Sequence, residues 1–184
     1  MGNLGFGEIL LLLILGLVAY GIFYLALRKP PQVLPSQGPT GVAGWLLLLV
    51  LGLVLFGPLL GFGQMNNGFH DAESRYPALI TMGKWNQYKV TTWAFFCLLS
   101  TMSVYAGVGL MKFRTPLIVR QAKMILWLIG PVEVLTFQIA LPLVFGGAHE
   151  NDPIQFLVSS VWAGVWTLYL SNSKRVRSTY GIES

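Results

Sequence analysis

Five long apolar stretches, separated by short polar links, constrain this chain more than any other feature of its sequence. A helix needs about 20 mostly apolar residues to cross the hydrocarbon core of a bilayer, with a lower limit of about 17. Because lipid cannot hydrogen-bond a bare backbone, each stretch that crosses must be helical. The sequence therefore predicts an all-α polytopic membrane protein with five transmembrane helices, at Leu4–Leu27, Val42–Phe62, Val90–Met111, Met124–Phe145 and Ile154–Leu170.

Composition narrows the class of protein further. Hydrophobic residues make up 54% of the chain and charged residues only 10%, against about 25% charged in soluble domains. This indicates one membrane domain with no room for a soluble enzyme domain. The single Cys97 lies inside the third stretch, which excludes an intrachain disulfide and a CxxC motif. The first stretch has no basic segment before it and exceeds a signal-peptide core of about 7–15 residues, so we expect a retained helix.

The charged residues give the predicted helices a direction. With the predicted spans, only three of the 12 Lys and Arg residues fall on the side of the membrane that carries most of the acids: Arg75, Lys84 and Lys89. The other nine fall on the opposite side. The positive-inside rule then places the N-terminus outside and the C-terminus in the cytoplasm. Basic residues beside span ends have anionic lipid headgroups as their simplest partner, so we expect no nucleic acid partner.

Proline divides the chain. Four prolines between Arg28 and Thr40 predict an extended, semi-rigid cytoplasmic link. The predicted organisation is an N-terminal anchor helix (residues 1–28), a Pro-rich linker (29–40) and a four-span domain with a basic cytoplasmic tail (41–184). Gly63–Gln87 is predicted as a long external loop, within which Tyr76–Trp85 forms a short interfacial helix.

Small residues at four-residue spacing predict where helices approach one another. Ser103-x-x-x-Gly107 and Ser160-x-x-x-Gly164 fit this pattern in the third and fifth stretches. Gly57-x-x-x-Gly61 ends the second stretch, and Pro58 inside it predicts a kink.

Glu133 is the one acidic residue near the centre of a predicted span. A charged carboxylate at mid-bilayer costs at least about 2.5 kcal/mol, so its side chain should face the bundle interior or be uncharged. Gly130 and Pro131 loosen the helix before it, and Gln138 follows. Glu133 could serve a proton or cation relay, contact a partner, or form a structural hydrogen bond between helices. The predicted spans hold no second mid-span acid or base, which counts against a pump.

Two further groups are candidate contact surfaces. Trp162, Trp166 and Tyr169 share one helical face at i, i+4 and i+7. That face could meet lipid, a pigment or a neighbouring subunit, and ordinary bundle or lipid packing is the simplest interpretation. Lys174, Arg175 and Arg177 form a juxtamembrane basic segment, for which lipid anchoring is a sufficient explanation and docking to a partner an alternative.

The two histidines stand beside acids, in His70-Asp71 and His149-Glu150, both on the predicted external face. Imidazole and carboxylate ligands suit zinc, copper or manganese, so the two segments could close one metal site. The spacing matches no established metal motif, and the sequence requires no cofactor. It also holds no P-loop, GxSxG or HExxH, so we do not expect an enzyme.

Residues from Gly41 onward resemble a known family. Gly44-Trp45-Leu46 opens the four-span unit, and Ser173-Lys174-Arg175-Val176-Arg177-x-Thr179-Tyr180 closes the chain, with Trp162 and Tyr169 shortly before. In these features the chain is similar to small bacterial inner-membrane proteins of about four spans, family twenty-five sixty-nine of the domains of unknown function. The resemblance implies a multi-pass protein of the bacterial inner membrane without an assigned activity. Residues 1–10 resemble the start of TatA-type subunits of the twin-arginine translocase, which also place the N-terminus outside.

These observations favour a non-catalytic accessory or assembly subunit of a bacterial inner-membrane complex, with the lipid bilayer and other membrane protein subunits as its partners. The alternative is a small transporter or channel that uses Glu133.

Overall fold

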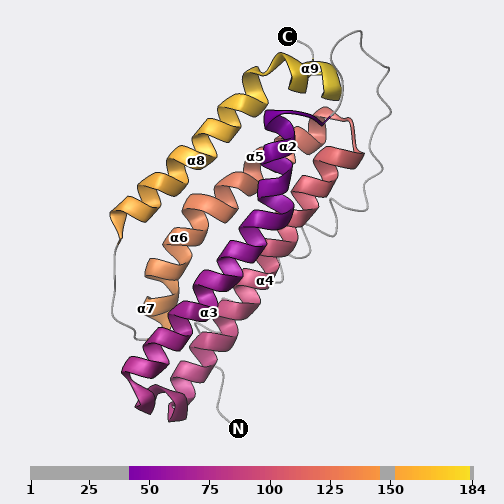
Figure 1. Cartoon of the computed structure of the whole chain (residues 1–184). Helices are drawn as coiled ribbons and strands as arrows, with labels where there is room; N and C mark the ends of the chain where they lie inside the picture. The colour runs from indigo at the N-terminus through magenta and orange to yellow at the C-terminus, as the bar shows by residue number, and fades with distance from the viewer. Residues whose placement is uncertain (1–41, 146–151, 183–184) are drawn as a thin grey trace.

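The computed structural model describes residues 42–145 and 152–182, and every regular element in these ranges is helical. Four long helices, consecutive in the chain, lie side by side (Figure 1). All four are long and apolar enough to cross a membrane: Trp45–Arg75, Gly83–Lys112, Pro116–Phe145 and Pro153–Asn172. The predicted all-α class is thus confirmed, with four of the five predicted spans. The anchor helix and the Pro-rich linker lie outside the described residues.

The first and third long helices are built from several segments. The first comprises α2 (Trp45–Leu51), the π-helical η1 (Gly52–Phe56) and α3 (Gly57–Arg75). A 3-10 turn, η2 (Pro77–Thr81), leads to the unbroken α4 (Gly83–Lys112). The third comprises α5 (Pro116–Trp127), the π-helical η3 (Leu128–Val132), α6 (Glu133–Leu135), the π-helical η4 (Thr136–Ala140) and α7 (Leu141–Phe145). The fourth is α8 (Pro153–Asn172), and a short α9 (Lys174–Tyr180) follows it.

Each π segment lies at a proline. Pro58 follows η1 by two residues, Pro131 lies inside η3, and Pro142 follows η4 by two residues. A proline ring has no N–H to donate and clashes with the carbonyl four residues earlier. In a π segment each N–H bonds to the carbonyl five residues earlier instead of four, which widens the helix and relieves this conflict. At Pro58, where the sequence predicted a kink, the helix has a π segment, and two further π segments flank Glu133.

The prediction that Gly63–Gln87 is a long loop is wrong. Helix α3 continues to Arg75, and α4 begins at Gly83, so the connection is only the turn around η2. The sequence turns polar after Phe62, but polar residues are compatible with helix once neighbouring contacts hold it. Here Phe69 is buried against α4, and Glu73 bonds to Lys89. The predicted interfacial helix is reduced to this 3-10 turn.

Small residues mark the closest helix contacts, as predicted for two of the three motifs. The hydroxyl of Ser103 donates to the carbonyl of Leu53 at 2.6 Å, and a Cβ at Gly107 would lie 2.5 Å from Val54. Gly61 is similarly covered by the ring of Phe96. The Ser160 motif differs: a Cβ at Gly164 would meet no atom within 4 Å in the described structure.

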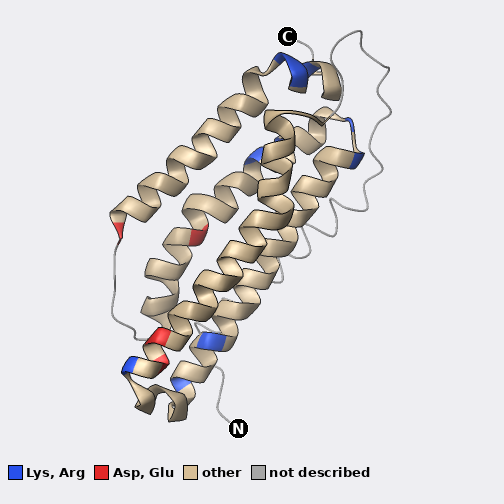
Figure 2. Cartoon of the chain, in the orientation of Figure 1, with Lys and Arg blue, Asp and Glu red and all other residues tan. Residues whose placement is uncertain are grey.

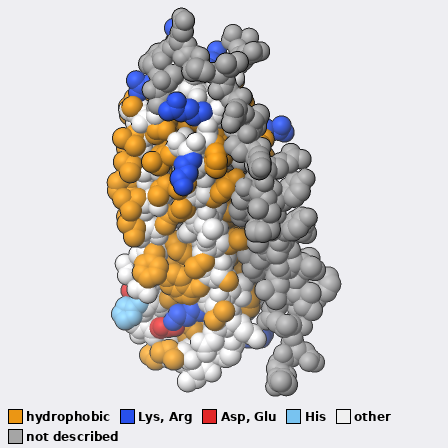
Figure 3. All heavy atoms as spheres, turned by 90° about the vertical axis from the view of Figure 1, so that its right-hand side faces the viewer, with side chains coloured by type: hydrophobic (Ala, Val, Ile, Leu, Met, Phe, Trp, Pro, Cys, Tyr) orange, Lys and Arg blue, Asp and Glu red, His pale blue; other side chains and the backbone are white. Residues whose placement is uncertain are grey.

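The two halves of the bundle have different cores. Next to α9 the core is mainly aliphatic and draws on α2, η1, α4, α5, α8 and α9. At the opposite end the contacts are aromatic and join α3, α4 and α7 through Phe62, Phe69, Trp85, Tyr88, Trp93, Phe96 and Phe145. Many large apolar side chains are exposed, and patches of them lie on the face shown in Figure 3.

Candidate functional site

The basic tail is a docked helix. On α9, Val176 and Tyr180 are fully buried in the aliphatic core, so the tail packs through its apolar side. Gly181 ends α9 in the left-handed conformation (φ 62°), which glycine adopts without steric cost. The sequence predicted a lipid-facing or partner-facing segment here and missed this packing. The apolar residues Val176 and Tyr180 between the cations were the signal that could have revealed it.

Helix α9 also caps two long helices. The last carbonyls of a helix lack intrahelical donors and need another partner. The Tyr180 hydroxyl donates to the carbonyl of Leu110 near the end of α4, at 2.6 Å. The Nε of Arg177 donates to the carbonyl of Ser171 near the end of α8, at 3.4 Å. Burial raises the pKa of the Tyr180 phenol, and Arg114 opposes this with a smaller effect. Because the pKa is raised, the hydroxyl stays protonated and remains a donor.

The opening and closing segments of the four-helix unit meet at this end. Gly44, just before α2, has a positive φ of 61°, and a Cβ there would lie 3.2 Å from the Nη1 of Arg175. Glycine at this position therefore suits both the backbone conformation and the close approach of the guanidinium. Leu46, the second residue of α2, is fully buried in the same core as Val176. Two motifs some 130 residues apart thus form one structural unit.

The cations of this unit have no acidic partner among the described residues. The one ion pair found in those ranges, Lys89 with Glu73, lies at the other end of the bundle. Figure 2 shows Lys and Arg gathered around α9 and the α4–α5 turn, with the acidic residues of the described ranges elsewhere. Lys174 is exposed, whereas Arg175 and Arg177 are half-buried. The basic end is formed by Lys112, Arg114, Arg120, Lys123, Lys174, Arg175 and Arg177.

Glu133 lies in the middle of the third long helix, between η3 and η4. It is half-buried, and the structure gives it no hydrogen bond or ion pair within the described ranges. Three residues earlier the helix meets α8 closely: a Cβ at Gly130 would lie 3.4 Å from the carbonyl oxygen of Ser159. Glu133 therefore sits beside the point where the third helix and α8 approach each other.

Beyond that point the two helices are joined by polar side chains at the surface. The amide of Gln138 donates to the side-chain oxygen of Gln155 at 2.8 Å, and this bond is exposed. The first ten residues of α8, 153–162, include no buried residue, whereas Ala163, Trp166 and Leu170 in its second half are buried. We call Glu133, Gln138, Gln155 and Ser159 the polar seam. It lies where the third long helix faces the first half of α8.

The predicted aromatic stripe forms, but it is not one free surface. Trp166 packs edge-on against Trp162 and against Tyr169, with ring centroids 5.5 and 5.8 Å apart. Trp166 is buried in the aliphatic core and Tyr169 is half-buried against it, whereas Trp162 is 57% exposed. Bundle packing therefore accounts for two members of the stripe, and Trp162 alone remains a candidate contact.

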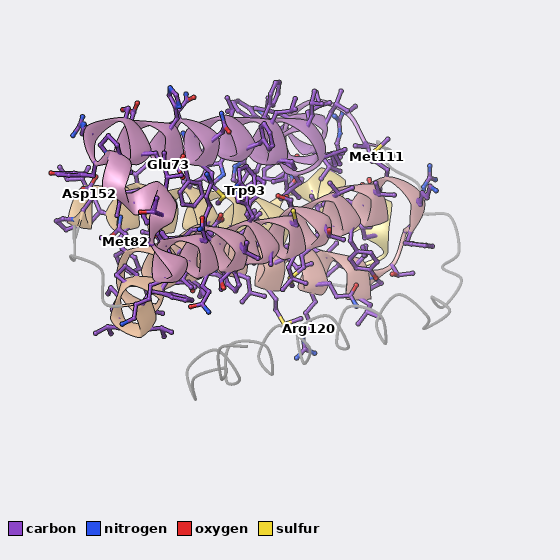
Figure 4. The ribbon with its side chains drawn as sticks, turned by 90° about the horizontal axis from the view of Figure 1, so that it is seen from below. Glu73, Met82, Trp93, Met111, Arg120 and Asp152 are labelled. Atoms are coloured by element: carbon purple, nitrogen blue, oxygen red, sulfur yellow. The ribbon has the colours of Figure 1, made fainter. Side chains whose placement is uncertain are left out.

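The α3–α4 hairpin at the other end holds a polar contact that the sequence did not reveal. One carboxylate oxygen of Glu73 accepts from the Nζ of Lys89 at 2.7 Å and from the Nε1 of Trp85 at 3.0 Å. Lys89 also lies over the ring of Phe69, 5.6 Å from its centroid. Glu73 and the turn marked by Met82 lie at the same end of the molecule (Figure 4). The contacting pairs are 12 to 20 positions apart in the sequence, so local spacing gave no signal.

The metal site predicted at His70, Asp71, His149 and Glu150 stays a prediction. His70 and Asp71 are exposed in the last turns of α3, whereas His149 and Glu150 lie outside the described residues. Within the described ranges, His, Cys, Asp and Glu form no group of three or more that could hold a metal ion.

One of three comparisons with known proteins finds a match, and its boundaries coincide with those of this folded unit. Searches of the curated proteins and of the solved structures return no match. A family profile described as "Protein of unknown function (DUF2569)" matches residues 39–181, which run from just before Gly44 to just after Tyr180. The match covers most of the chain and contains all four long helices together with α9. The chain therefore belongs to this family.

Proposed function

We propose that the protein is a non-catalytic accessory or assembly subunit of a bacterial inner-membrane complex. The observation that carries the proposal is the polar seam, because polar groups within membrane spans are costly unless another polar group satisfies them. Glu133 is half-buried without a described partner, and the Gln138–Gln155 bond is exposed. A helix of a partner subunit packed along the seam would supply a polar partner for Glu133 and would cover the Gln138–Gln155 bond.

The first half of α8 supports a protein partner over lipid at this place. Its exposed side is apolar at Trp162, and the same side carries Gln155 and the half-buried Ser159, which precede Trp162 by seven and three residues. Apolar and polar groups mixed on one side of a span suit another helix, since interhelical contacts in membranes use both packing and hydrogen bonds. The predicted anchor helix would add a second means of holding a neighbour.

Photo-crosslinking from Trp162, which lies beside the seam three residues after Ser159 on the same side of α8, tests this proposal. A photoreactive phenylalanine analogue at Trp162 should give an adduct of higher mass in native membranes. Leu168 is the matched control, because it lies on the same helix, is similarly exposed (63% against 57%) and is off the seam. A crosslink from position 162 only within the chain itself, or equal adducts from both positions, would contradict a partner at the seam.

A transporter or channel that uses Glu133 is the second candidate. The π segments on both sides of Glu133 favour it, because π-bulges are frequent at functional sites. Glu133→Gln keeps the size and polarity of the side chain and removes its charge. A transporter of this kind should lose proton or cation flux in liposomes with Glu133→Gln, at unchanged thermal stability. Unchanged flux would rule this candidate out.

We further propose an orientation in the membrane and a fifth span. The basic end faces the cytoplasm, the α3–α4 hairpin faces outward, and residues 4–27 form a fifth span that starts outside. The sorting of the cations supports this orientation: seven cluster at the α9 end, and Arg75, Lys84 and Lys89 lie at the hairpin end (Figure 2).

A further inference from the structure

The corner between α2 and α9 brings cations and an indole ring together at one end of the bundle. Arg175 approaches the backbone at Gly44, and Lys174 lies exposed beside it on α9. Trp45, the next residue after Gly44, is 67% exposed. Indole rings prefer the headgroup level, and α4 and α8 end at Lys112 and Asn172, where α9 begins its course across the bundle end. Cation and indole are therefore held together at the expected headgroup depth.

An apolar surface continues from Trp45 along the first long helix. Leu48 is 44% exposed one turn below, and Gly52 follows at the next turn on the same side. A Cβ at Gly52 would meet no atom within 4 Å in the described structure, so the surface is open at this point. Leu55, beyond Gly52, is exposed as well. The corner thus offers a cationic top, an aromatic middle and an apolar lower part.

The cations here differ from ordinary flexible basic tails. Arg175 and Arg177 belong to a helix fixed by the buried Val176 and Tyr180, so their backbone is already ordered before any ligand arrives. Ordering groups in advance reduces the entropic cost of binding. Guanidinium groups also match phosphate geometry, with two donors that can bond two oxygens. The described residues of this end include no acid that could neutralise them.

We propose that the α2–α9 corner binds one anionic glycerophospholipid, with its phosphate at Arg175 and Lys174, its glycerol level at Trp45 and an acyl chain along Leu48 and Gly52. The charge, the indole and the open apolar surface occur in the order that such a lipid presents from headgroup to chain. This site is independent of the polar seam, which lies on the third helix and α8, so either can fail without the other.

Lipid retention by the purified full chain tests the site. The chain is purified in mild detergent and offered phosphatidylglycerol and phosphatidylcholine in equal amounts, and bound lipid is counted by native mass spectrometry. Wild type should retain phosphatidylglycerol selectively. Arg175→Gln and Lys174→Gln should each lower this preference about fivefold, the expected effect of removing one cation at an anionic surface.

Arg75→Gln is the matched control, because Arg75 is an exposed cation at the opposite end of the first long helix. It should leave the preference unchanged. An equal loss in Arg75→Gln would mean that net charge alone selects the lipid, and the site would be refuted. Displacement of the lipid by inorganic phosphate at matched concentration would likewise refute a lipid site, because it would indicate recognition of phosphate alone.

A second measurement avoids any change at Arg175, where a variant could unfold α9. Chain-brominated phosphatidylglycerol in vesicles should quench the fluorescence of wild type more than brominated phosphatidylcholine does. Trp45→Phe removes an exposed ring and should abolish most of that difference. If Trp45→Phe leaves the difference intact, the indole is not at the lipid site and the proposal is wrong.

Discussion

The two ends of the bundle hold their helices together in opposite ways. At the α9 end, the closing contacts are the buried Tyr180 and Val176, and the many cations remain without acidic partners in the described structure. At the hairpin end, the ammonium of Lys89 is paired with the carboxylate of Glu73, which also accepts a hydrogen bond from Trp85 within an aromatic cluster. A basic segment can therefore be held in the fold by its apolar residues while its charges stay available to a ligand.

The largest effect should come from breaking the closure at the α9 end. Tyr180→Ala removes a fully buried ring and should lower the free energy of unfolding by about 3–5 kcal/mol. Tyr180→Phe removes only the bond to Leu110 and should cost about 1–2 kcal/mol. Thermal unfolding in detergent measures both. Wild-type stability in Tyr180→Ala would mean that α9 does not hold the bundle end.

The next effect concerns the contact of α4 with the first long helix. Gly107→Ala would place a methyl group 2.5 Å from Val54 and should destabilise the protein by about 1–3 kcal/mol. Gly164→Ala is its control in the second small-residue motif, where space is open. Alanine favours helix over glycine, so Gly164→Ala should be neutral or stabilising by up to about 1 kcal/mol. Equal effects of both changes in thermal unfolding would contradict the assigned contacts.

The smallest effect is expected at the hairpin end. Lys89 and Glu73 are 33% and 20% exposed, so water screens their attraction. A double-mutant cycle with Glu73→Gln and Lys89→Gln should give a small coupling, below the effect of Gly107→Ala, that weakens in high salt. Arg75→Gln, an exposed cation without an ion pair in the described structure, should change stability less. A coupling as large as the Tyr180→Ala effect would reverse the comparison of the two ends.

Hydropathy predicted the helices, and charge predicted which residues gather at each end. Four apolar stretches were found as helices close to their expected positions, and Ser103 and Gly107 were found at a helix contact. Hydropathy could not predict that α3 continues to Arg75, because contacts with α4 stabilise that polar segment. The docking of α9 was missed for a similar reason: Tyr180 bonds to a carbonyl 70 residues earlier in the chain.

The candidate sites show the same division between local and distant information. Glu133 was singled out because one residue's depth in a predicted span can be read from the sequence. The meeting of Arg175 with Gly44 could not be, because it depends on how the first and last helices are brought together. The separation of Trp162 from the buried Trp166 likewise depends on how α8 packs against its neighbours.

The proposed topology places the two ends of the bundle on opposite sides of a membrane, with the basic end in the cytoplasm. Single cysteines at Thr81, in the hairpin turn, and at Lys174, at the start of α9, test it in a Cys97→Ser background; both positions are exposed. With an impermeant maleimide, intact cells should label position 81, and position 174 should react only after permeabilisation. Labelling of both positions from outside, or of position 174 alone, would contradict the account.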